Sequence, residues 1–384
     1  MTISTEQGRA AGRAAAPPRP QAAADEVRRL LEACVSRGAS DLHVRPGNPP
    51  VLRVTGNLER LSEAPFDTAA SAAFCRALCS DSQWASLGEA GTVDLALTYG
   101  NGERFRVSVM RERAGFSASL RRVTAQLLTF EEIGLDRATV TGLLRQTRGL
   151  ILVTGQTGSG KSTTLAAMLD WINEHLDRHI VTIEDPVEYI HRSRRSLITQ
   201  REVGSDVPSF AEAMRRVLRQ DPDVIMVGEM RDLETIATAT TAAETGHLVL
   251  GTLHTTGSAK TVSRIIDVFP PNQQEQIRVQ LAMSLLAVIS QVLVPTRPGG
   301  TDRAGNPIPS RIAALEVMTA TPAISNLIRQ NEIVRMQDVM QTSRDRGMFT
   351  LDDHLALLVR KGVVEREVAL AFCLDPRLFE ARLH

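Results

Sequence analysis

The sequence GLILVTGQTGSGKSTT, residues 149–164, decides the fold of this chain. It begins with an apolar, partly β-branched run, which is typical of a strand buried on both faces of a parallel sheet. It then turns through glycines and continues into residues that favour a helix. From Gly155 to Ser162 it fits G-x-x-x-x-G-K-[ST], the P-loop pattern, in the strand, loop and helix setting that this pattern requires.

This loop has the chemistry of a phosphate-binding site. Glycine lets the backbone curl so that successive N–H groups point at one phosphate chain, and the helix N-terminus adds partial positive charge. Lys161 can reach the β- and γ-phosphates, and the Ser162 hydroxyl can ligate Mg²⁺. We therefore predict that ATP and Mg²⁺ bind here. The expected nucleotide-binding residues are Gly155, Gln156, Thr157, Gly158, Ser159, Gly160, Lys161, Ser162 and Thr163.

Length and composition narrow the class of protein. With 384 residues, two or three domains are expected. Lys plus Arg equals Asp plus Glu at 44 each, so charge gives no reason to expect a nucleic-acid partner. No apolar run approaches the roughly 20 residues that cross a bilayer, and the first residues lack a signal-peptide core. The four cysteines form no C-x-x-C pair, so a reducing, cytosolic compartment is the default expectation.

The N-terminal part is expected to hold a tail, a first domain and a linker. Residues 1–24 are rich in Ala, Pro, Arg and Gly, which predicts a disordered tail. Residues 25–123 combine helical and alternating patterns, which predict an α+β domain. Its expected strands are residues 40–45, 51–54, 92–97, 104–110 and 116–123. Residues 124–147 look like a linker with one short helix.

The expected ATPase core spans residues 148–294. Four apolar runs alternate there with helical patterns, which predicts a parallel sheet with helices on both faces. These runs are residues 150–153, 180–183, 224–227 and 248–253. Polar residues follow each run, at the sheet edge where ligands bind in such folds. We also expect a long helix over residues 273–294 and a helical C-terminal region over 295–384, with a turn or hairpin tip at 295–310.

Acidic residues follow two of the expected strands. Glu229 lies where a Walker-B acid would hold Mg²⁺ through water or orient the attacking water, although Gly228 stands where an Asp is usual. Glu184, Asp185 and Glu188 cluster in one turn, where one carboxylate could bind metal and another polarise water. The alternative for both groups is a set of solvated charges at strand ends.

Histidines and arginines complete the candidate catalytic set. His254 follows the last strand at its phosphate-side end and could sense the γ-phosphate, whereas His247 lies near the opposite end of that strand. Several arginines crowd the end of the first domain. We expect at least one, with Arg106 and Arg121 favoured, to neutralise charge in the transition state. Structural histidines and a solvated charge run are the alternatives.

Three further segments resemble one family closely. TIEDPVE at residues 182–188 resembles the Asp box of secretion ATPases, and DPDVIMVGEMRD at 221–232 resembles their atypical Walker B. Residues 241–247 and 254–256 resemble their His box. Within that superfamily AISNLIR, residues 323–329, resembles the AIRNLIRE element of the PilT-type pilus retraction ATPases. Ser325 and Gln330 depart from that element, and the tetracysteine zinc module of many extension and type II secretion relatives is absent.

This resemblance implies an architecture and a set of roles. The N-terminal domain is expected to be PAS-like and the C-terminal domain RecA-like, and six subunits are expected to form a ring. By position, Glu188 matches the glutamate proposed to activate water and Glu229 the glutamate that organises Mg²⁺, while Glu184 competes with Glu188. The implied partner is an inner-membrane platform protein, at whose cytoplasmic face the ring would work.

Three functions stay open from the sequence. The first is a hexameric ATPase that powers retraction of type IV pili, and hence twitching motility. The second is the same engine driving pilus extension or type II secretion. The third is an accessory nucleotide-binding ring with little turnover, which the altered AISNLIR element keeps open. A nucleic-acid motor is disfavoured, because the chain offers neither a basic groove nor many aromatic side chains for stacking.

Overall fold

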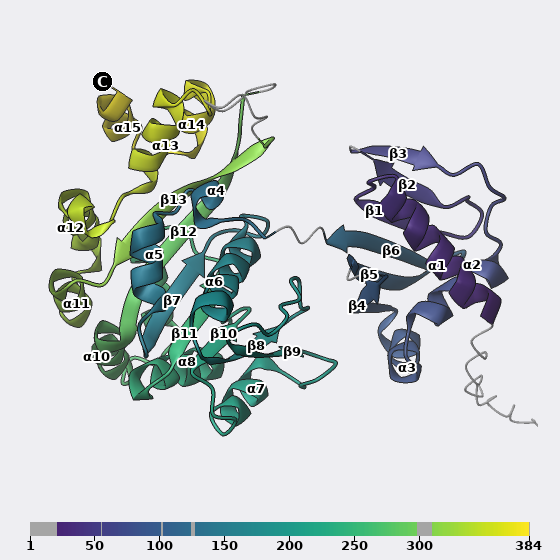
Figure 1. Ribbon diagram of the computed structural model, residues 1–384, viewed down its shortest axis with the longest axis horizontal. Coiled ribbons are helices and arrows are strands. Elements are labelled where there is room, and N and C mark those ends of the chain that lie inside the picture. The colour runs from purple at the N-terminus through teal and green to yellow at the C-terminus, as the bar shows by residue number, and fades with distance from the viewer. Residues whose placement is uncertain (1–20, 55, 101–102, 124–126, 298–308, 384) are drawn as a thin grey trace, which may run out of the picture. The chain divides into compact units, whose positions relative to one another are not determined.

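The computed structural model describes residues 21–383 except 55, 101–102, 124–126 and 298–308 (Figure 1). The chain divides at residue 125 into two compact units. We assigned residues 21–24 to the disordered tail, but they form the first turn of helix α1 (Gln21–Ser36). They extend towards the N-terminus the helix whose later turns bury Val27, Leu30, Leu31 and Cys34. The remainder of the expected tail lies outside the described residues.

The first unit is a six-stranded antiparallel sheet in the order β3-β2-β1-β6-β5-β4. Its strands are β1 (Asp41–Val44), β2 (Val51–Val54), β3 (Asn57–Arg60), β4 (Thr92–Tyr99), β5 (Glu103–Glu112) and β6 (Gly115–Val123). Helices α1, α2 (Thr68–Leu78) and α3 (Asp81–Ala90) cover one face through a core that includes Leu30, Leu42, Phe74 and Phe105. This is the predicted α+β fold. The sequence did not reveal β3, all of whose residues are exposed.

The second unit is built on a seven-stranded sheet in the order β13-β12-β7-β11-β10-β8-β9. All neighbours pair in parallel except β13, which is antiparallel to β12. The strands are β7 (Gly149–Thr154), β8 (His179–Glu184), β9 (Leu197–Glu202), β10 (Val224–Val227), β11 (Leu248–Leu253), β12 (Leu285–Pro295) and β13 (Arg311–Thr319). The four predicted strands are confirmed as β7, β8, β10 and β11, which form adjacent central positions.

Helices cover both faces of this sheet (Figure 1). One face packs against α4 (Phe130–Ile133), α5 (Arg137–Leu144) and α6 (Lys161–His175). The other face packs against α7 (Phe210–Val217), α8 (Leu233–Thr245), α9 (Ser258–Asp267) and α10 (Gln274–Ser284). The expected linker therefore differs from the structure, because its apolar residues Phe130, Ile133 and Leu144 are buried in the core of the second unit.

The prediction of one long helix over residues 273–294 was wrong. Helix α10 ends at Ser284, and residues 285–295 form strand β12. A continuous apolar run fits a buried helix and a buried strand equally well. Here β12 pairs with β7 on one side and β13 on the other, so tertiary pairing decides the structure. The C-terminal region is likewise not wholly helical, since β13 belongs to it.

Beyond β13, the described residues are mostly helical. The helices there are α11 (Pro322–Arg329), α12 (Met336–Thr342), α13 (Leu351–Arg360), α14 (Arg366–Phe372) and α15 (Pro376–Leu383). A small core around Leu355 and Phe379 packs α13 to α15 against the ends of β12 and β13. Among the described residues, no helix has the length and apolar character that crossing a membrane requires.

Candidate nucleotide site

The P-loop lies between β7 and α6, and its glycines have the geometry that a phosphate cradle requires. Gly155, Gly158 and Gly160 all have φ between 77° and 147°, which other residues rarely adopt. A Cβ on Gly155 would lie 2.2 Å from the carbonyl oxygen of Gln291, so no side chain fits there. Gly160 precedes α6 and offers no side-chain cap, which leaves the N–H groups of the first helical turn to a ligand.

Lys161 lies in the first turn of α6 and bends back over the loop. Its Nζ donates to the carbonyl oxygens of Gly155 at 2.8 Å and Gln156 at 3.1 Å. Burial lowers the pKa of Lys161, and the carboxylates of Glu229 and Glu188 oppose that change. The lysine therefore lies in the electrostatic field of both predicted catalytic acids, although they come from different strand ends. Ser162 beside it is exposed at the start of the helix.

Glu229 and His254 meet after the ends of β10 and β11. The His254 Nε2 lies 2.7 Å from Glu229 Oε1, and the Arg231 side chain bonds to the same oxygen. Glu229 is only 18 % exposed, whereas the Arg231 side chain is 76 % exposed. The two residues assigned to the Walker B and to phosphate sensing thus lie in close polar contact. Arg231, which bonds to the same carboxylate, is a member of the cluster that we did not predict.

Close backbone packing explains why a glycine, Gly228, precedes Glu229. A Cβ at Gly228 would lie 3.1 Å from the carbonyl oxygen of Ile183 and 3.3 Å from the Cα of Glu184. The backbone N–H of Gly228 also donates to the Ile183 carbonyl at 2.8 Å. The ends of β8 and β10 thus approach so closely that an aspartate at this position would need the neighbouring backbone to shift by a few tenths of an ångström. Glu229 is the acid that this strand end supplies.

The loop after β8 carries Glu184 and Glu188, and the structure separates their environments. Glu184 is buried at 8 % exposure and accepts hydrogen bonds from the Thr182 hydroxyl at 2.6 Å and Gln200 Nε2 at 3.1 Å. The backbone N–H of Glu188 also bonds to this carboxylate, and burial raises the pKa of Glu184. Glu184 is therefore engaged inside the loop, whereas Glu188 is half-buried and acts on Lys161.

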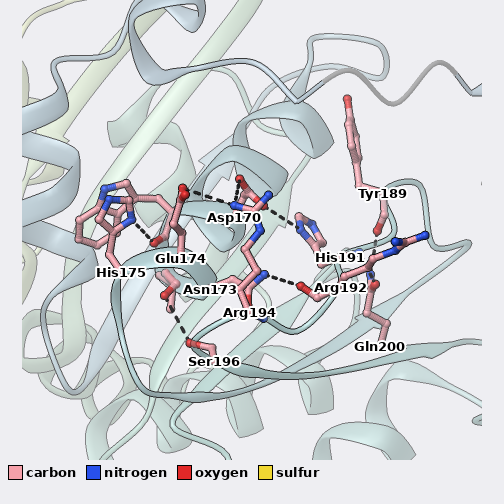
Figure 2. Close-up of polar contacts among 12 residues, drawn as sticks. Asp170, Asn173, Glu174, His175, Tyr189, His191, Arg192, Arg194, Ser196 and Gln200 are labelled. Carbon is pink, nitrogen blue, oxygen red and sulfur yellow. Dashed lines mark hydrogen bonds and ion pairs between the residues drawn. The ribbon is translucent and has the colours of Figure 1, made fainter.

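Gln200 on β9 holds this acidic loop in place, as Figure 2 shows. Its Nε2 donates to the Tyr189 carbonyl at 2.8 Å as well as to Glu184, and its Oε1 accepts the His191 N–H at 2.8 Å. One amide thus bonds to both ends of the segment that contains Glu188. Sequence reasoning missed Gln200, because β9 has an alternating, half-exposed pattern without a motif.

The acidic loop is also joined to α6, the helix that follows the P-loop. The Tyr189 hydroxyl lies 2.8 Å from the Thr163 hydroxyl. His191 faces Asp170, with 4.0 Å between the His191 Nδ1 and an Asp170 carboxylate oxygen (Figure 2). Further along, Asn173 bonds to the backbone of the same loop. Thr163, predicted to contact nucleotide, therefore has a second partner that couples the P-loop helix to the segment with Glu188.

Three predicted residues lie apart from this cluster or in the other unit. His247 precedes β11, and its Nδ1 contacts the Ala242 carbonyl at 3.1 Å. The six residues of β11 separate His247 from His254, which corresponds to about 20 Å along the strand. The structure therefore does not bring His247 to the site within one chain. Arg106 and Arg121 are cross-strand partners on β5 and β6 of the first unit, and Arg121 also bonds to Asp41 at 2.8 Å.

The described residues offer no ready-made metal cage. No group of three or more His, Cys, Asp or Glu side chains is placed to hold an ion in the described part of the chain. Mg²⁺ usually keeps several waters and binds through one or two protein oxygens plus substrate phosphates. The exposed Ser162 hydroxyl and the Glu229 carboxylate are such oxygens, so the donor set fits a magnesium ion that arrives with a nucleotide.

Comparison with known proteins finds a matching family and similar relatives. The profile of the family described as "Type II/IV secretion system protein" matches residues 21–369. The chain is 45 % identical over 344 residues to the type IV pilus retraction ATPase PilT of Pseudomonas aeruginosa, covering 90 % of this chain and 97 % of the relative. It is 37 % identical to the type IV pilus ATPase PilU of the same organism, covering 90 % and 88 %.

A solved structure also matches. The crystal structure of the pilus retraction motor PilT with bound ADP superposes with a TM-score of 0.83 at 41 % identity. The match covers 92 % of this chain and 98 % of that chain. An N-terminal domain followed by a nucleotide-binding domain is thus an arrangement that the chain shares with this solved structure.

Proposed function

The chain belongs to the type II/IV secretion system protein family, and from that premise we propose that it is an ATPase motor that powers type IV pilus retraction. One observation carries the chemical part. Lys161, Glu188 and Glu229 come from the ends of separate strands, and the two carboxylates act on the lysine ammonium. The relative named a pilus retraction ATPase, 45 % identical over almost its whole length, supports the biological part.

The P-loop would hold the triphosphate of ATP. The N–H groups of the loop and of the first turn of α6 would bind the β- and γ-phosphates. Lys161, now bonded to the carbonyls of Gly155 and Gln156, would exchange those partners for phosphate oxygens. Ser162 and Glu229 would hold Mg²⁺, which neutralises charge on the phosphates when it is bound.

Glu188 is our candidate for the base that orients the attacking water. It is half-buried and close enough to Lys161 that its charge opposes the lowering of the lysine pKa by burial. Glu184 is less suited, because three donors already engage its carboxylate. His254 would hold Glu229 in position and report the γ-phosphate to the chain beyond β11. Arg106 or Arg121 of the first unit would neutralise charge as the phosphate leaves.

The working form would be a homo-hexamer in the cytoplasm, at the inner face of the membrane. Closure of the two units on ATP, and release after hydrolysis, would turn chemical steps into movement. A ring of six could pass those movements to a membrane-embedded platform protein.

A gene deletion, complemented by variants, tests the proposal. A deletion strain should carry more surface pili than wild type and should not twitch. The wild-type gene should restore both properties, whereas Lys161→Ala should restore neither, although the variant protein is present at normal level. A deletion strain without pili would contradict retraction and favour extension, and a strain with normal pilus number and motility would contradict both.

An accessory role is the second candidate, and the departures at Ser325 in α11 and at Gln330, which follows its last residue, favour it. The chain is also 37 % identical to the pilus ATPase PilU over most of both lengths. In that case purified protein would bind ADP with ordinary affinity but turn ATP over slowly on its own. Steady-state phosphate release from purified protein distinguishes the two roles.

A further inference from the structure

Strand β12 carries two adjacent polar residues, Ser290 and Gln291, in an otherwise apolar run. They are 4 % and 1 % exposed. Consecutive residues on a strand point to opposite faces of the sheet. Buried polar side chains cost free energy unless they are hydrogen-bonded, so the partners of this pair show what the strand holds in place.

Gln291 is bonded to the P-loop and to α6. Its Nε2 donates to the Ser159 carbonyl at 2.6 Å, and its Oε1 accepts the Thr164 hydroxyl at 2.9 Å. Its backbone carbonyl packs against Gly155, where it leaves no space for a Cβ. One residue therefore contacts the start of the P-loop, its end and the first turn of the helix that follows.

Ser290 is bonded to the loop on the other side of the sheet. Its hydroxyl accepts the N–H of Gly257, at 2.8 Å, in the loop that runs from His254 to α9. The next residue, Ser258, donates its N–H at 2.6 Å to Glu316 of β13, the strand residue paired with Ser290. The His254 loop is thus fixed to β12 and β13 by two successive backbone groups.

We propose that Ser290 and Gln291 are positioning residues that couple the P-loop to the loop of His254 through strand β12. The strand is paired on both sides, so it resists bending and keeps the two loops in one relative geometry. A displacement of the P-loop on nucleotide binding then moves the His254 loop with it. The inference rests on the proposed nucleotide site, to which neither residue contributes a direct contact.

Three variants of the full chain test the coupling: Gln291→Met, Ser290→Ala and the double variant. Gln291→Met keeps the volume but leaves the Ser159 carbonyl and the Thr164 hydroxyl without this partner, so the Kd for ADP should rise about tenfold. Ser290→Ala should lower kcat about fivefold and change the Kd for ADP less than twofold. Because the two residues act through one strand, their effects on kcat should not multiply. The factor by which kcat falls in the double variant should be at least threefold smaller than the product of the factors measured for the two single variants.

Gln280→Met is a matched control. Gln280 on α10 donates to Glu244 at 3.0 Å, outside the candidate site, so this variant loses a glutamine hydrogen bond without touching either loop. It should bind ADP as wild type does. If Gln291→Met fails to fold, Thr164→Val takes its place, because it removes the hydroxyl that donates a hydrogen bond to Gln291 Oε1. This variant should also weaken ADP binding, and Thr164→Ser should restore it.

The outcomes separate two failures. If wild type binds ADP but Gln291→Met, or Thr164→Val in its place, binds it equally well, the coupling is wrong and the proposed function stands. Losses of kcat that multiply in the double variant would also overturn the coupling. If wild type neither binds ADP nor hydrolyses ATP, the proposed function itself fails.

Discussion

Replacing Glu188 and Glu184 by glutamine, one at a time, tests which carboxylate activates water. The substitution removes the charge and the basicity but nearly preserves the shape. Loss of a positioned general base usually costs 10²–10⁴ in rate, so Glu188→Gln should lower kcat by about 10² or more. Its Kd for ADP should change little, because the P-loop supplies the phosphate contacts.

Glu184→Gln should have a much smaller effect. The glutamine can keep one acceptor for the Thr182 hydroxyl or the Glu188 N–H, and it removes the cost of burying a charge. The charge-assisted hydrogen bonds that it weakens contribute about 1.5 kcal/mol at the low end, which is about tenfold in rate if the loop shifts. We therefore expect kcat within about tenfold of wild type.

Phosphate release at saturating ATP, together with calorimetric titration of ADP, measures both effects. The titration shows that each variant retains a formed site. The assignment is refuted if Glu184→Gln loses about 10² in kcat with normal ADP binding while Glu188→Gln keeps wild-type turnover. In that case the buried carboxylate would be the base, and its raised pKa would be part of the mechanism.

Three further predictions follow from the same contacts. His254→Asn should lower kcat by 10- to 100-fold with ADP affinity retained in a calorimetric titration, because the shorter side chain loses the 2.7 Å contact between His254 Nε2 and the Glu229 carboxylate; unchanged kcat would refute the pairing. Gln200→Met leaves the Tyr189 carbonyl and the His191 N–H without this partner, so the free energy of unfolding in urea should fall by about 2 kcal/mol and kcat should fall more than KM changes. Burial lowers the pKa of His354 to about 4, so its neutral form stabilises the fold above pH 6.5, and that contribution is lost as the pH falls towards 4. The loss is at most about 3 kcal/mol, and His354→Gln should show a flatter dependence of urea stability on pH in that window than wild type; equal slopes would contradict it.

The P-loop strand, loop and helix could be predicted because their signals are local. A strand of apolar β-branched residues, glycines at positions of positive φ and a following lysine specify that element with few long-range contacts. The other strands β8, β10 and β11 were predictable for a related reason, since each is an apolar run bounded by polar residues. Residues at their carboxyl ends were therefore located correctly at one sheet edge.

Strand β12 could not be predicted in the same way. Leu285 to Leu293 is apolar throughout, apart from Ser290 and Gln291, and its pattern gives no period that separates strand from helix. The choice depends on pairing with β7, which lies far away in the sequence, and with β13, which follows β12 in the chain. With the wrong element assigned, the two polar residues on β12 could not be related to the loops that they contact.

The sequence by itself determined that this chain carries the P-loop pattern, which acids and histidines follow the central strands, and which family it resembles. Only the tertiary structure decided that Glu184 is engaged inside its loop while Glu188 acts on Lys161. It also decided that Gln200 bonds to the loop that contains Glu188 and that Gln291 bonds to the P-loop. The reason is physical. Local patterns fix backbone conformation within a few residues, but hydrogen bonds between distant strands depend on how the whole sheet is paired.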